Sequence, residues 1–163
     1  EVIAAAKAAE VPVICDPKLT GLHRTLGATV ALFEIRGLEL LRRRSNLPDA
    51  ESTAAHFIEE HDWQGMLVLG GEHGTTLYQK DEDPLFLPCL IEVPQQLIGL
   101  HDAAATALAC ALGAGRTLAE GARLANAACE CVLAAETSRV VLDRKKLMTR
   151  LDELSWHFQI SDR

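Results

Sequence analysis

The chain has 163 residues, 48% of them hydrophobic and 24% charged, proportions that exclude a disordered tail, a collagen-like fibre and a mucin-like stalk. Its formal net charge of −7 repels a phosphate backbone, so we expect no nucleic-acid partner. The longest near-apolar stretch, 103–114, is shorter than the roughly 20 residues of a membrane-spanning helix, so we expect no membrane partner. Five cysteines without a CxxC pair favour reduced thiols in a cytoplasmic protein.

The first half of the chain alternates helical stretches with short apolar runs. The expected helices are 1–10, 37–44 and 49–62. The expected strands are 11–15, 28–33 and 66–69. Runs that are apolar throughout are typical of strands covered on both faces of a parallel sheet. Strands that alternate with helices in this way indicate right-handed βαβ crossovers.

The second half begins with a glycine-rich turn at 70–74 and then becomes helical. Apolar runs at 75–78 and 85–91 predict an antiparallel hairpin at the edge of the sheet. The expected helices are 102–114, 117–136 and 143–154. Thr117 and Glu120 have the spacing of a capping box at the start of the second of these helices. The whole chain is therefore expected to be one α/β unit with a helical C-terminal part.

Three stretches of the sequence stand out together: VPVICDPK, GATV and DAAATALACALGAGRTLAEGARLANAA. In this order they resemble the C-terminal half of the pfkB/ribokinase sugar kinases, most closely the heptose 7-phosphate kinase domain of bifunctional ADP-heptose synthases. The resemblance implies a three-layer αβα sandwich, with a mostly parallel sheet and an antiparallel edge hairpin. It places the kinase domain at 1–154 and a tail or the start of a linker at 155–163. The chain is then expected to form a homo-oligomer or to lack its N-terminal half, which supplies the lid in this family.

The start of the alanine-rich helix matches the family's G-A-G-D signature with Gly99-Leu100-His101-Asp102. By this resemblance Asp102 is the base that takes a proton from the attacking sugar hydroxyl, and Gly99 with the helix start holds the charge of the transferring phosphoryl group. An aspartate at a helix start is also a favourable N-cap, and that alternative stays open. His101 replaces the second glycine of the signature. The bulk of its side chain indicates that the anion hole is lost. The alternative is that its side chain, when protonated, carries a positive charge near a phosphate.

The resemblance implies ATP and Mg²⁺ as cofactors. Gly71 and Gly74 would border the nucleoside, and Asn126 matches the helix that lines the base pocket. An ordinary glycine turn is the alternative for the two glycines, and a backbone or water partner is the alternative for the asparagine. On the metal side, Gly37 stands where the family has an acidic residue, so no residue is assigned as a metal ligand. Ile98 likewise stands where a polar residue is usual.

The implied activity is phosphoryl transfer from ATP to a sugar or sugar phosphate, of the heptose 7-phosphate kinase kind. The departures at Gly37, Ile98 and His101 all touch the handling of charge, where a single loss can cost about 10²-fold in rate. We therefore expect catalysis to be impaired or lost. The alternative function is a catalytically silent kinase-like module that serves packing, dimerisation or scaffolding.

Overall fold

The computed structural model describes residues 1–137 and 143–161. Five strands form one sheet in the order of the sequence: β1 (Ile14–Cys15), β2 (Val30–Glu34), β3 (Gly65–Leu69), β4 (Thr75–Gln79) and β5 (Leu85–Leu87). Strands β1, β2 and β3 are parallel, whereas β4 and β5 each run antiparallel to the strand before them. The expected mostly parallel sheet with an antiparallel edge hairpin is confirmed.

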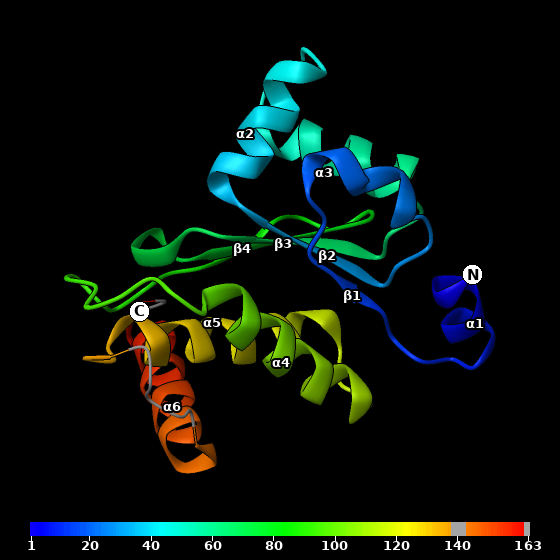
Figure 1. The fold of residues 1–163 in the computed structure, drawn as a ribbon. Helices are drawn as coiled ribbons and strands as arrows, with labels where there is room; N and C mark the ends of the chain where they lie inside the picture. The colour runs from blue at the N-terminus through cyan, green and yellow to red at the C-terminus, as the bar shows by residue number, and fades with distance from the viewer. Residues whose placement is uncertain (138–142, 162–163) are drawn as a thin grey trace.

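Helices cover both faces of this sheet, and Figure 1 shows the resulting three layers. The helices are α1 (Val2–Ala8), α2 (Ile35–Arg44), α3 (Ala50–Glu60), α4 (Leu100–Gly113), α5 (Leu118–Leu133) and α6 (Arg144–Ser161), with short 3-10 turns η1 (Leu19–Arg24) and η2 (Gly71–His73). Helices α2 and α3 lie on one face, α4 and α5 lie on the other, and α6 packs against α5. No helix of the described residues is long and apolar enough to cross a lipid bilayer.

Strands β2 and β3 are apolar from Val30 to Phe33 and from Gly65 to Leu69, because both of their faces are buried there. Phe33 and Val68 point into the cluster beneath α2 and α3, together with Trp63. Leu32 and Leu67 point the other way, into the cluster beneath α4 and α5. Side chains alternate between the faces of a strand, so only a strand with two covered faces needs every position to be apolar. The interpretation as doubly covered strands is confirmed for the runs 28–33 and 66–69, whereas the run 11–15 contributes only a two-residue, half-buried strand at the sheet edge.

Local capping fixes where two of the helices begin. The Asp49 carboxylate accepts a hydrogen bond from the Ser52 N–H at 2.7 Å at the start of α3. Thr117 and Glu120 bond each other's backbone N–H groups at the start of α5. Both arrangements satisfy N–H groups that have no acceptor within the helix. The predicted capping box is therefore confirmed.

Several element boundaries differ from the expected ones. Strand β1 has only two residues, because Pro12 has no N–H and the Val13 N–H is taken by the Thr29 hydroxyl. Strand β5 ends at Leu87 because Pro88 follows it. Helix α6 continues past residue 154, so the predicted boundary between a domain and a tail falls inside a helix. The boundary remains a prediction, and residues 162–163 of the predicted tail lie outside the described part of the chain.

Candidate functional site

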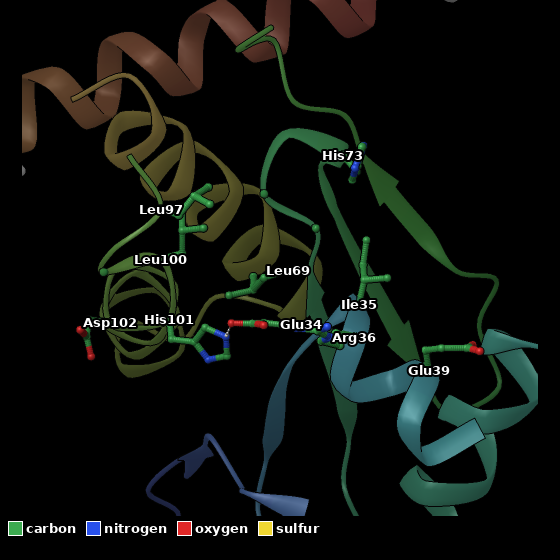
Figure 2. A pocket seen from close by; sticks show the side chains of 13 residues that line it. Glu34, Ile35, Arg36, Glu39, Leu69, His73, Leu97, Leu100, His101 and Asp102 are labelled. Carbon is green, nitrogen blue, oxygen red and sulfur yellow. Dashed lines mark ion pairs between the residues drawn. The ribbon is translucent and has the colours of Figure 1, made fainter. Parts of the chain in front are cut away.

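A cavity of about 600 Å³ opens where the carboxyl ends of β2 and β3 meet the start of α4. Open parallel sheets bind their ligands at this edge. Its lining is partly aliphatic, from Ile35, Leu69, Leu97 and Leu100, and partly polar, from Glu34, Arg36, Glu39, His73, His101 and Asp102, with Gly70, Gly71 and Gly99 between them. Figure 2 shows His101, Glu34 and Leu69 close together from α4, β2 and β3, whereas the side chains of Glu39 and Asp102 project away from them.

Helix α4 begins earlier than the sequence suggested, at Leu100. Its N-cap is Gly99, which has φ +96° and ψ 5°, a left-handed conformation that glycine adopts without steric cost. Asp102 therefore lies inside the first turn, and the alternative that it serves as the N-cap is wrong. Asp102 is exposed, and it borders both this cleft and a second cavity on the side of Thr106.

The imidazole of His101 lies between two carboxylates. Its Nδ1 is 3.0 Å from Asp16 Oδ2, and its Nε2 is 3.3 Å from Glu34 Oε1. Asp16 follows β1 directly and Glu34 ends β2. In Figure 2, His101 points across the cleft toward Glu34, whereas Asp102 projects from the other side of α4. When the ring is protonated, the two ion pairs join the start of α4 to the ends of two neighbouring strands.

The remaining charges offer little to a phosphate group. The carboxylate of Glu39 is held by Arg42 and Arg43, whose hydrogen bonds lower its pKa from 4.5 to about 2. Arg36 is the arginine in the lining, and none of the described residues that line the cavity is a lysine. Acidic groups thus outnumber permanently positive ones at this edge of the sheet.

The structure brings together four of the six residues predicted for the site. Asp102, Gly99, His101 and Gly71 all line the cleft. Gly74 does not line it. It lies at the end of the η2 turn, where a Cβ atom would come within 2.3 Å of the Leu87 carbonyl oxygen.

Asn126 also lies away from the cleft, on the buried side of α5. Its Nδ2 donates a hydrogen bond to the Pro88 carbonyl at 3.0 Å. The side chain borders a small cavity that Leu151 and Leu154 of α6 also line. A buried amide needs such a partner, and here the partner is a backbone group, one of the alternatives that the sequence left open.

The aliphatic part of the lining was not expected from the sequence. Leu97 is 62% exposed beside the cleft, and Ile98, which is 76% exposed, borders the neighbouring cavity next to Asp102. In the sequence, the signal for this aliphatic lining was the pair of large apolar residues Leu97 and Ile98 directly before Gly99. The pairing of His101 with two distant carboxylates had a weaker signal: each acidic residue follows an apolar run, and parallel strands bring their carboxyl ends to one edge.

The residues present do not fit a bound Mg²⁺. Within residues 1–137 and 143–161, no group of three or more histidine, cysteine, aspartate or glutamate side chains is arranged to hold a metal ion. The two carboxylates at the strand ends, which are the kind of ligand Mg²⁺ uses, lie against the His101 ring instead. The fit to ATP is partial, because the first N–H groups of α4 and the three glycines that line the cleft suit a phosphorylated ligand.

The fold places the chain in a structural class, that of proteins with a ribokinase-like fold. Ribokinase from Thermotoga maritima superposes with a TM-score of 0.78 at 19% identity, covering 93% of this chain and 52% of that one. Ribokinase from Arabidopsis thaliana in complex with ribose and ATP gives a TM-score of 0.73 at 22% identity, covering 92% of this chain and 50% of that one. No protein-family model matches the chain.

Similarity in sequence points to one group within this class. The bifunctional protein HldE of Photobacterium profundum is 36% identical over 124 residues, which is 76% of this chain and 26% of that protein. The chain spans about a quarter of the length of the curated relatives it matches. The predicted relationship to pfkB/ribokinase sugar kinases, and within them to the ADP-heptose synthases, is confirmed.

Proposed function

We propose that this chain is the nucleotide side of a carbohydrate kinase module of the heptose 7-phosphate kind, and that its phosphoryl transfer is impaired. The observation that carries the proposal is the position of Asp102. Asp102 is exposed in the first turn of α4 and is one of the residues that border a cleft formed by the carboxyl ends of parallel strands. The similarity to HldE supports the choice of substrate class.

In this proposal Asp102 acts as general base. ATP, when bound, supplies the γ-phosphoryl group. Asp102 takes the proton of a sugar hydroxyl while that hydroxyl's oxygen bonds to the γ-phosphorus and the bond from phosphorus to ADP breaks. The N–H groups of Leu100 and His101, at the start of α4, stabilise the charge on the transferring group. No step is assigned to a metal ion.

Three features of the lining support the impairment. The His101 ring lies at the start of α4, in the turn that would face the phosphate. Glu34 adds a negative charge beside it. Leu69 gives an aliphatic surface at the end of β3, where its side chain offers no hydrogen bond to a phosphate oxygen. Each loss of a donor or gain of a like charge weakens transition-state stabilisation.

The test is ATP turnover by the full-length protein with a heptose phosphate as acceptor. We expect Asp102→Asn to lower kcat by about 10²-fold or more, with little change in KM for ATP, because it removes the base and leaves the helix start intact. Glu59→Gln is the control, since Glu59 is an exposed acidic residue on α3, outside the cleft. An Asp102→Asn variant as fast as the wild type would contradict the assignment of the base.

A catalytically silent module is the second candidate. The observation that favours it is the exposed apolar pair before α4, Leu97 and Ile98, which suits contact with a second copy of the chain or with an N-terminal half of the module. Melting of the full-length protein with and without millimolar Mg·ATP separates the two candidates, because a ligand of the native state raises the melting temperature by mass action. No shift, together with no turnover, favours the silent module.

A further inference from the structure

The His101 ring separates two cavities. One is the cleft of about 600 Å³ described above. The other, of about 420 Å³, lies on the side of Lys18 at the start of η1. His101, Glu34 and Arg36 line both cavities. These three side chains therefore lie between the two cavities, and the His101 ring and Glu34 are paired among them.

Two carboxylates from different strands hold the ring in this position. Both ring nitrogens are buried and neither forms a hydrogen bond with a residue that the structure describes, although oxygens of Asp16 and Glu34 lie 3.0 and 3.3 Å away. The two carboxylates are themselves more than half exposed. A protonated ring would therefore form an ion pair on either side, with carboxylates that remain in contact with solvent.

A phosphate group at the start of α4 would have to displace this ring. The displaced ring would then leave Asp16 and Glu34 facing the phosphate, and these like charges oppose binding, although their exposure to solvent screens part of the repulsion. The bulk of the His101 ring and the charge of the two carboxylates thus both oppose phosphate binding. The clasp, defined as His101 with Asp16 and Glu34, also makes the link between strand ends and helix start that a bound ligand would otherwise make.

We propose that the clasp is an internal plug, which closes this cleft to phosphate-bearing ligands and divides a single groove into two cavities. The inference rests on the proposed function, because that function supplies the expectation of a phosphorylated ligand at the start of α4. His101 is in this view the residue that decides whether such a ligand enters.

The experiment is calorimetric titration of the full-length protein with Mg·ATP. We expect His101→Ala to bind at least about 10-fold more tightly than the wild type, because it removes the ring that must be displaced. Glu34→Gln, which removes one carboxylate from the clasp, should tighten binding by a smaller factor. His56→Ala is the matched control, because His56 also lies 3.5 Å from a carboxylate, that of Glu60, but outside the cleft on α3.

A purely structural role for His101 would loosen the fold in the variant without tightening its ligand binding. Wild-type and His101→Ala proteins with the same Kd for Mg·ATP would overturn the plug, while turnover by the wild type would leave the proposed function standing. No binding by any variant, with no turnover, would overturn the proposed function and the plug with it. If His101→Ala does not fold, Glu34→Gln decides, and a Kd equal to that of the wild type overturns the proposal.

Discussion

Replacement of Gly74 by alanine should destabilise the protein severely. Gly74 has φ +81° and ψ −162°, a backbone conformation reserved for glycine, and forcing another residue into it costs roughly 1–3 kcal/mol. An added Cβ would also lie 2.3 Å from the Leu87 carbonyl oxygen and 3.1 Å from Pro88 Cα. These are backbone atoms that cannot rotate away, so the strands must shift, at a further cost of about 1–3 kcal/mol. The sum of the two mid-range costs is about 4 kcal/mol.

Gly71→Ala is the matched comparison. Gly71 also has a positive φ, +60°, but the nearest atom to its added Cβ is Leu97 Cδ2 at 4.0 Å. The left-handed conformation alone costs about 1–2 kcal/mol. Each kcal/mol lowers the melting temperature by about 2–4 °C in a domain of this size, so we expect a fall of about 12 °C for Gly74→Ala and about 5 °C for Gly71→Ala.

Urea unfolding of the full-length protein checks the loss of stability expected for each substitution, because the shift of the unfolding midpoint at constant m-value reports the change in unfolding free energy. Equal destabilisation by the two substitutions would refute the steric argument for Gly74. A Gly74→Ala protein of normal stability that binds Mg·ATP more weakly would show instead that Gly74 contacts the nucleotide, as the resemblance implies.

Two further substitutions test charges through pH. Burial raises the pKa of the Glu130 carboxyl, which also accepts a hydrogen bond from the Leu90 N–H. Folding therefore favours the protonated form of this carboxyl, and the stability of the protein falls as the pH rises above about 4.5. Glu130→Gln should raise the melting temperature at pH 7 but not at pH 4. The pKa of Glu39 is lowered to about 2 by hydrogen bonds from Arg42 and Arg43, so its stabilisation is present above about 4.5 and lost toward pH 2. Glu39→Gln should therefore lower the melting temperature at pH 7 and leave it unchanged near pH 2. Melting curves from pH 2 to 8 check both, and the opposite sign at pH 7 would contradict either.

The central part of the fold was predictable because its signals are local and strong. The run that ends at Phe33 and the run that begins at Met66 are apolar at nearly every position, and only a strand covered on both faces requires that pattern. The ends of the outer strands were predicted less well. Pro88 ends β5 locally, but β1 is also shortened by a hydrogen bond from the Val13 N–H to the Thr29 hydroxyl, a contact that no local pattern in the sequence states.

The candidate site was predictable only in part, for a similar reason. Asp102 and Gly99 share one helix turn, so a short motif finds both of them. The partners of His101 come from the ends of β1 and β2, and no spacing within the sequence states that they meet. Asn126 shows the converse: its burial was predictable from its apolar helix face, but the choice of the Pro88 carbonyl over a ligand was decided by the packing of α5 against the end of β5.

The clasp and the aliphatic lining beside it bear on different steps of the proposed reaction. The His101 ring lies 3.0 Å from Asp16 and 3.3 Å from Glu34, so a protonated ring is a positive partner for both carboxylates from within the chain. Leu69 at the end of β3 and Ile35 at the start of α2 line the same cleft, and their side chains offer no hydrogen-bond donor to a phosphate. Removal of the ring alone should therefore reopen the cleft to phosphate without restoring the donors that stabilise phosphoryl transfer, so that ligand binding and turnover become separable properties of this module.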